Sequence, residues 1–188
     1  MAKYKGWKKR YSYLDDYKKG MNGEYVYYGR HYIYQGDLPI RKYKWLLGIT
    51  DILLAVLYIV AGLQDAGVIW NRWYVVLPYA AHVVVVFLLI WKCLTLIFEK
   101  VPVKAYMYKK SVPWFRPLGL ILAVICALLI IGTVICMAVD PEQVRMTGCI
   151  IFLVIMVLMG VIGVLFADRV RKYPWELDPS EEGESEIS

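Results

Sequence analysis

Three ionisable side chains, Asp51, His82 and Lys92, lie inside long apolar stretches of this 188-residue chain and are its first candidates for chemistry. Side chains of these types can hold or transfer a proton, and ionisable residues inside a membrane usually line a helix bundle or a polar pathway. Two roles are therefore open to them. They can form an ion or proton pathway, or they can form the hydrogen bonds and ion pairs that hold helices together.

Asp51 has the most informative surroundings, because it lies about two turns inside Trp45 on a stretch with helical spacing. The small and polar residues on the same side of that helix are Gly48, Ala55 and Gly62, with Tyr58 near them. An ionised Asp facing lipid costs at least about 2.5–3.5 kcal/mol, so this side is expected to face protein. We favour a packing role, in which Lys92 either extends to the headgroups or reaches back to Asp51.

His82 follows Pro78 by one helical turn. Its ring can serve a proton relay, a packing hydrogen bond, or the backbone group that the proline leaves unsatisfied, and we favour packing. Cys93 lies on the same helix face, but the eleven residues between the two positions correspond to about 16 Å along a helix. This distance excludes a Cys/His dyad within one helix.

The cysteine spacing predicts no metal site and no cofactor. The four cysteines are Cys93, Cys126, Cys136 and Cys149, and none belongs to a C-x-x-C motif or a Cys/His ligand pattern. Cys136 and Cys149 fall at similar depth on consecutive predicted helices, so a disulfide between them is one hypothesis. The alternative, which we favour, is that all four are small buried hydrophobic residues.

Four apolar runs must position these side chains. They cover 45–63, 74–97, 117–139 and 148–167, and each is long enough to cross about 30 Å of hydrocarbon as a helix. With 60% hydrophobic residues, the sequence predicts an all-α membrane protein with four transmembrane helices in a bundle, arranged as two tandem hairpins. The hairpins are expected at 45–98 and 117–167, joined by a connection at 99–116.

Charge predicts the orientation. Basic residues are frequent in the tail 1–44, in the connection and just after Ala167, whereas the outer loops hold only Arg72 and Arg145. The positive-inside rule then places both termini in the cytoplasm of a protein of the cell membrane. The segment 168–188 forms a second cytoplasmic tail, which is acidic and expected to be disordered at its end.

The N-terminal tail is rich in tyrosine and predicts a small β-hairpin within 24–35. Gly29-Arg30 is typical of a type II′ loop, so Tyr27 would pair with Tyr32 and Tyr25 with Tyr34. The predicted cytoplasmic interaction face consists of Tyr25, Tyr27, Tyr32, Tyr34 and Arg30. Because an isolated hairpin is marginal in water, this face should rest on the membrane, on a partner, or on a second Tyr-x-Tyr segment.

That second segment contains Tyr106 and Tyr108, which follow Tyr32 and Tyr34 at a constant offset, with Pro39 recurring as Pro113. The match suggests a tandem repeat in which each unit has an amphipathic entry and a transmembrane hairpin. Chance and shared interfacial chemistry explain it equally well.

The sequence contains no P-loop, GxSxG or HExxH motif and no paired carboxylates for acid/base catalysis. Our leading hypothesis is a non-enzymatic accessory or scaffold subunit, whose basic cytoplasmic face contacts anionic lipid and other membrane or cytoplasmic protein subunits, and not nucleic acid. The alternative is a small oligomeric transporter or channel component that uses Asp51 and His82. An intramembrane enzyme that uses a cysteine is a third hypothesis.

Overall fold

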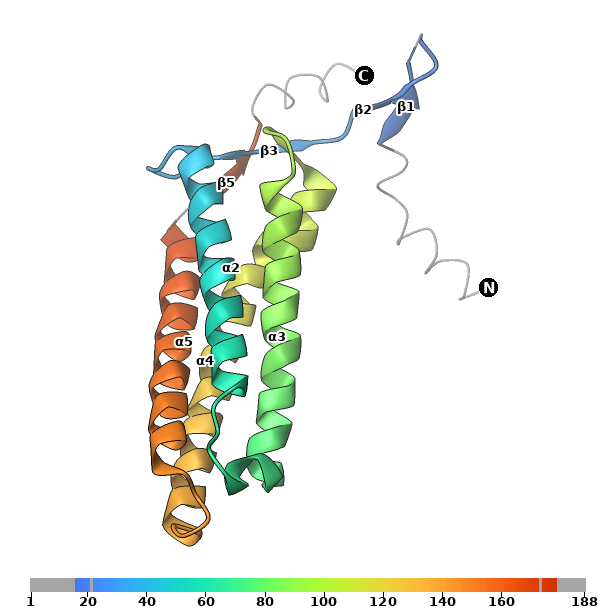
Figure 1. The fold of residues 1–188 in the computed structure, drawn as a ribbon. Helices are drawn as coiled ribbons and strands as arrows, with labels where there is room; N and C mark the ends of the chain where they lie inside the picture. The colour runs from blue at the N-terminus through green and yellow to red at the C-terminus, as the bar shows by residue number, and fades with distance from the viewer. Residues whose placement is uncertain (1–15, 21, 173, 179–188) are drawn as a thin grey trace, which may run out of the picture.

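Four long helices lie side by side, and short strands gather at one end of them, in a computed structural model that describes residues 16–20, 22–172 and 174–178 (Figure 1). The helices are α2 (Ile40–Gly62), α3 (Trp73–Ile97), α4 (Ala105–Val139) and α5 (Met146–Lys172), with the short 3-10 helix η2 (Val68–Asn71) before α3. The strands are β1 (Tyr17–Lys19), β2 (Tyr25–Tyr27), β3 (His31–Tyr34), β4 (Val103–Lys104) and β5 (Trp175–Leu177).

All four helices are long and apolar enough to cross a membrane, which confirms the predicted number of candidate spans within the described residues. The shortest, α2, has 23 residues, or about 35 Å of helix. Helix α4 begins at Ala105, well before the predicted start at 117, because the chain stays helical through both Pro113 and Pro117. Most of the predicted connection 99–116 is therefore the first part of α4.

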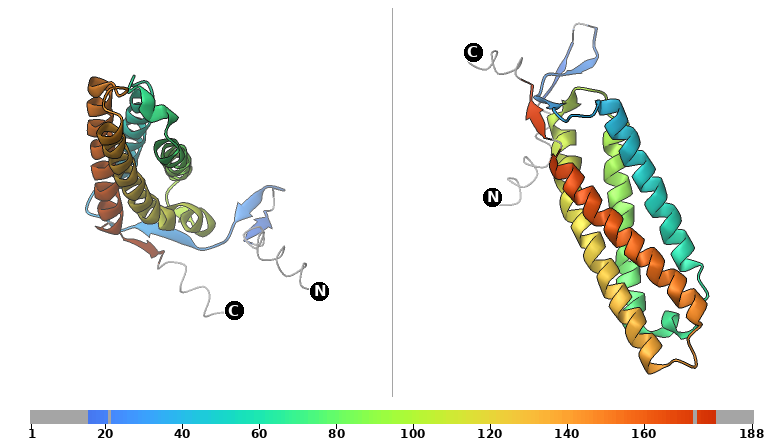
Figure 2. Two further views of the ribbon diagram at one scale, coloured as in Figure 1. Left: turned by 90° about the horizontal axis from the view of Figure 1, so that it is seen from below. Right: turned by 90° about the vertical axis from the view of Figure 1, so that its left-hand side faces the viewer.

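Helix α4 is the centre of the packing and lies between α3 and α5 (Figure 2). Glycines allow α4 and α5 to touch through their backbones at Gly119 and Gly163. A Cβ atom added to Gly163 would lie 2.8 Å from the carbonyl oxygen of Gly119. Helix α2 packs less extensively, against α3 and α5. The bundle is thus tightest between α4 and α5.

One three-stranded antiparallel sheet, with the order β4-β3-β5, joins three distant parts of the chain at the end of the helices. Tyr32 of β3 is paired with Val103 of β4 on one side and with Leu177 of β5 on the other. The segment before α2, the α3–α4 connection and the segment after α5 therefore lie at the same end. We call this end of the molecule the sheet end.

The predicted hairpin within 24–35 is wrong. Strand β2 is paired with β1, with Tyr17 opposite Tyr27, through a turn in which Gly23 has a φ angle of 80°. Gly29 lacks the positive φ angle that a type II′ loop requires. The sequence pattern of β3 was read correctly as a strand, but β3 gains two neighbours from elsewhere in the chain, and a central strand is more stable than half of an isolated hairpin.

The two Tyr-x-Tyr segments are not structural repeats. Tyr32 and Tyr34 lie in strand β3, whereas Tyr106 and Tyr108 lie in the first turns of helix α4. They pack against each other instead, since the Tyr32 and Tyr108 rings stack with centroids 3.9 Å apart. The second Tyr-x-Tyr segment is thus one surface on which the first one rests.

The opposite end of the helices, which we call the loop end, is closed by contacts between two loops. Arg72 pairs with Asp140, and Arg145 pairs with Asp65. The Asp140 carboxylate raises the pKa of the Arg72 guanidinium. Both arginines predicted in the outer loops are therefore neutralised by acids of the opposite loop.

Candidate functional site

Asp51 lies on the inner side of α2 and is only 4% exposed. The Cys93 thiol of α3 faces its carboxyl group. A thiol is a weak donor, and neither carboxyl oxygen has a hydrogen bond of normal geometry within the described part of the chain. Asp51 is therefore a buried polar group whose hydrogen-bonding capacity is met only by a weak thiol donor.

Lys92 points away from Asp51 and toward α4. Its ammonium group donates a hydrogen bond of 2.7 Å to the carbonyl oxygen of Lys110 and lies 5.8 Å from the centre of the Trp114 ring. The contact between Lys92 and Asp51, which was one of the two options for this lysine, is not formed. Lys92 instead joins the end of α3 to the proline-containing part of α4.

His82 is fully buried between α3 and α4, where its Nε2 atom lies 3.5 Å from the Cys126 thiol. Its ring also packs against Tyr58 and Tyr79, whose own rings stack 5.1 Å apart. The Tyr79 hydroxyl donates to the carbonyl oxygen of Tyr58. These contacts form a His/Cys pair between helices, which spacing along one helix cannot reveal. The packing role favoured for His82 stays a prediction.

The arrangement does not join Asp51 and His82. Asp51 of α2 lies at the level of Cys93 of α3. His82 lies on α3 as well, about 16 Å from Cys93 along the helix axis. The buried residues of α3 between those levels are Val85, Val86 and Leu89, all of them apolar. Among the described residues, the two polar positions are separate sites.

A groove of about 620 Å³ runs between α2 and α3 at the sheet end, and Asp51 forms part of its wall. Its volume is within the range of ligand pockets in proteins. Arg41 and Lys44 line the end of the groove nearest the sheet, and Gly48 and Ala55 line its length. Lys44 donates to the carbonyl oxygens of Ile97 and Glu99, where it stabilises the end of α3.

The tyrosines of the predicted interaction face occupy different surroundings. Tyr32 stacks on Tyr108, and Tyr34 stacks on Tyr43 with centroids 4.9 Å apart and also contacts Trp175. Tyr27 packs edge-on against the rings of Tyr17, His31 and Tyr106. Tyr25 is 73% exposed, and Arg30 is also exposed. The structure therefore uses most of these rings to hold the sheet end together.

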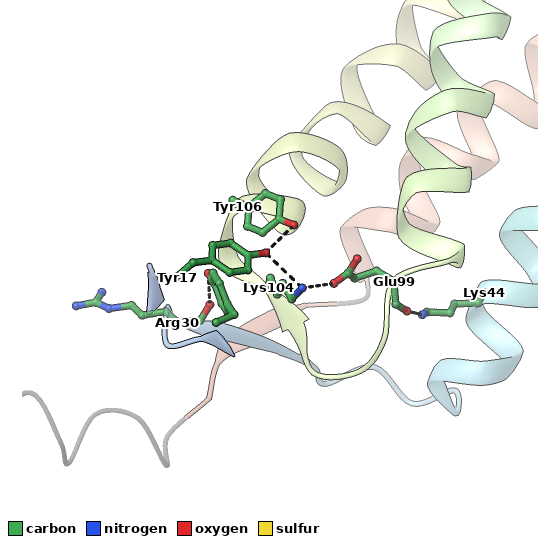
Figure 3. A network of polar contacts seen from close by, with 7 residues as sticks. Tyr17, Arg30, Lys44, Glu99, Lys104 and Tyr106 are labelled. Carbon is green, nitrogen blue, oxygen red and sulfur yellow. Dashed lines mark hydrogen bonds and ion pairs between the residues drawn. The ribbon is translucent and has the colours of Figure 1, made fainter. Parts of the chain in front are cut away.

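A polar network connects the β1–β2 hairpin to the helices (Figure 3). The Tyr17 hydroxyl lies 3.4 Å from the Tyr106 hydroxyl and 3.5 Å from the Lys104 ammonium, which also approaches Glu99 at 3.9 Å. The Glu99 carbonyl accepts the hydrogen bond from Lys44 on α2. The network is a continuous chain of contacts from the hairpin to α2.

All four cysteines are free thiols, so the structure does not contain the Cys136–Cys149 disulfide. The Cys149 thiol donates instead to the carbonyl oxygen of Ala66, at 3.5 Å, in the loop that follows α2. The favoured reading, small buried hydrophobic residues, agrees with this arrangement. Within the described ranges, no group of three or more His, Cys, Asp or Glu side chains is placed to hold a metal ion.

Cationic side chains crowd the sheet end. The exposed ones are Lys18, Lys19, Arg30, Arg41, Lys42, Lys100, Lys109, Lys110, Arg116, Arg169, Arg171 and Lys172. Arg41 is one of several in this set that have no ion pair or hydrogen bond with a described residue, and it lies next to the groove. Arg41 and Cys126 were not predicted as site residues, because each acquires its neighbours only when helices pack.

No protein-family model matches this chain, and no match was found among curated proteins or solved structures. The functional argument consequently depends on the geometry and charge described above.

Proposed function

We propose that this protein is a non-enzymatic multi-pass subunit of the cell membrane, which serves as an accessory or scaffold component of a membrane assembly. The sheet end is the docking end, and both termini are in the cytoplasm. Its partners are other membrane or cytoplasmic proteins, with anionic lipid headgroups at the same surface. No nucleic acid or cofactor takes part in this proposal.

One observation carries the proposal, namely the difference between the two ends of the helices. The sheet end has many exposed basic side chains, whereas Arg72 and Arg145 at the loop end are paired with acids. By the positive-inside rule, this asymmetry favours a cytoplasmic sheet end. A basic surface beside the bilayer attracts anionic headgroups and acidic protein surfaces.

The construction of the sheet end also supports docking. Three segments that are far apart in the sequence meet in one sheet, and aromatic stacking holds that sheet against α2 and α4. A surface held in this way is pre-organised, and pre-organisation lowers the entropic cost of binding.

The test has two parts, and the first is orientation. A reporter fused after Ser188 and a cysteine in place of Lys100 should both be accessible from the cytoplasm, whereas a cysteine in place of Glu142 should be labelled by an impermeant thiol reagent from outside. The native cysteines are buried and give little background. External labelling at position 100 would refute the orientation.

The second part is partner binding by full-length protein purified in mild detergent. A stoichiometric partner should copurify, and charge reversal of Lys18, Lys19 and Arg30 to Glu should weaken its retention at least fivefold. Arg145→Glu, which reverses one charge at the loop end, is the control and should retain the partner. A homogeneous preparation without a partner would contradict the proposal.

A transporter or channel that uses Asp51 and His82 is the second candidate, favoured by the burial of both groups and by the poorly satisfied carboxyl group of Asp51. Its weakness is the apolar layer of Val85, Val86 and Leu89 between them. In reconstituted vesicles, ion or substrate flux that is abolished by Asp51→Asn in a folded protein would establish this function instead.

A further inference from the structure

The groove between α2 and α3 is built differently from the other helix contacts. Residues of α2 and of the last part of α3 form both walls, and the groove extends from Arg41 to Ala55 along α2. That span corresponds to about 21 Å of helix, or four turns. It begins at the basic sheet end and continues into the apolar part of the bundle.

We propose that this groove binds a transmembrane helix of another protein, which places a hydrogen-bond donor side chain opposite Asp51. The inference rests on the proposed function, because it identifies how the accessory subunit contacts its partner inside the membrane. The donor belongs to a polar residue such as Asn, Ser or Lys, at the depth of the carboxyl group.

Asp51 is the first argument. It is 96% buried yet lines the groove, and the only donor that faces its carboxyl group among the described residues is the weak Cys93 thiol, without a hydrogen bond of normal geometry. In a membrane, a buried polar group that is poorly satisfied is unfavourable, and water is not present to satisfy it. When the Asp51 side chain turns toward the groove, a donor from an adjacent helix satisfies the carboxyl group.

The small residues on either side of Asp51 are the second argument. Gly48 and Ala55 lie one turn to each side of it and also line the groove. A Cβ atom added to Gly48 would have its nearest neighbour, the end of the Ile97 side chain, at 3.6 Å. Small residues let helix backbones approach closely, and here the α3 side leaves that surface only partly covered.

Charge argues against a second copy of this chain. In a membrane, a two-fold axis along the bilayer normal brings the groove of one copy to the same depth as the groove of the other, so Arg41 lies at the level of a second Arg41 and Asp51 at the level of a second acceptor. Two arginines at one level are unfavourable, and neither copy supplies the strong donor that Asp51 needs. A different protein can offer an acidic group to Arg41 and a donor to Asp51.

The depth of Asp51 argues against a membrane lipid. Asp51 lies about 15 Å along α2 from Arg41. A phospholipid whose headgroup binds Arg41 would place hydrocarbon near that depth, and hydrocarbon has no donor. A polypeptide helix can carry a polar side chain at any depth.

The experiment uses the full-length protein in phosphatidylcholine vesicles and two synthetic transmembrane peptides as probes. One peptide is a Trp-flanked poly-leucine helix, and the other has a single Asn two turns inside its Trp, which matches the spacing of Trp45 and Asp51. Energy transfer between labelled protein and labelled peptide measures binding. The Asn peptide should bind about 5- to 30-fold more tightly, as expected for one interhelical hydrogen bond.

Variants of the protein test whether the preference for the Asn peptide arises in the groove. Asp51→Leu should remove the preference for the Asn peptide, while Asp51→Asn, which keeps hydrogen-bonding capacity, should retain it. Ala55→Phe should weaken binding by filling the groove, whereas Ala127→Phe, which fills a separate groove between α4 and α5, should have no effect. Gel filtration of every variant verifies that the protein is folded.

Equal binding of the two peptides, or a preference that survives Asp51→Leu, would overturn the proposal. Energy transfer between two labelled copies of this protein that is lost when the peptide is added would also overturn the proposal, because the groove would then bind a second copy. Loss of peptide binding in phosphatidylglycerol vesicles would assign the groove to lipid. Because the peptides replace the natural partner, these outcomes are separate from the copurification result that tests the proposed function.

Discussion

The α4–α5 contact and the α2–α3 contact differ in how closely their two helices approach. Between α4 and α5, Gly119 and Gly163 bring backbone against backbone, and the surrounding side chains are apolar. Between α2 and α3, a groove of about 620 Å³ remains, and the only donor that faces Asp51 among the described residues is the weak Cys93 thiol. The first contact leaves a smaller groove, of about 370 Å³, and no charged side chain lines it. The second has the properties of a surface that another helix completes.

This difference between the two contacts shows that a stripe of small and polar residues predicts a helix contact without identifying its partner. Such stripes occur on α2 and on both α4 and α5. In α4 and α5 they meet each other, whereas on α2 the stripe around Asp51 lies in the groove. Single substitutions in the α4–α5 contact and in the α2–α3 contact test this difference in packing.

Gly163→Ala should have the largest effect on stability. The new methyl group would lie 2.8 Å from the Gly119 carbonyl oxygen, so the two helices must separate, at about 1–3 kcal/mol. Gly48→Ala adds the same methyl group in the α2–α3 groove and should leave the thermal midpoint unchanged or raise it. Equal losses in thermal unfolding in detergent would remove the distinction between the contacts.

Trp175→Ala should loosen the sheet end, including the start of α2, and leave the α4–α5 contact near Gly119 intact. Trp175 packs on Tyr34 and on Tyr108 of α4, and Tyr34 stacks on Tyr43 of α2, so two aromatic contacts of about 0.5–1.5 kcal/mol each are lost there. Hydrogen exchange should accelerate in the first turns of α2 and change little near Gly119. Faster exchange throughout all four helices would mean that α2 is as firmly packed as the rest.

Asp51→Leu should stabilise the isolated protein by about 1 kcal/mol or leave it unchanged, because it removes a buried carboxyl group whose only donor among the described residues is the weak Cys93 thiol. A strong packing hydrogen bond to Asp51 would instead make this substitution destabilising. Chemical denaturation in detergent provides the measurement. A lower stability would show that the α2–α3 contact is already satisfied.

Asp51→Leu and Lys92→Met should have additive effects, within about 0.3–0.5 kcal/mol. Lys92 contacts Lys110 and Trp114 rather than Asp51, so the two substitutions disturb different contacts. A double-mutant cycle measures the coupling. Coupling well above this limit would place the lysine and the carboxyl group together.

The four spanning helices could be predicted from the sequence, because length and apolar composition determine whether a helix can cross a bilayer. The contact of Gly119 with Gly163 was not predicted, because residue size shows that a helix face allows close approach but not which face it meets. The hairpin was wrong because the Gly29-Arg30 turn signal is local, whereas β3 is paired with segments about 70 and 145 residues away. Cys126 beside His82 and Arg41 beside the groove depend on how helices pack, which no spacing along one helix contains.

The most direct test of the contrast is site-specific photo-crosslinking in intact cells. A photoreactive residue replaces Ile52, which lines the α2–α3 groove, or Val157, which lies on α5 beside the α4–α5 groove. We expect a protein adduct of one defined mass from position 52, its loss in the Asp51→Leu background, and no defined protein adduct from position 157. Lipid adducts alone at both positions, or the same protein adduct at both, would contradict it.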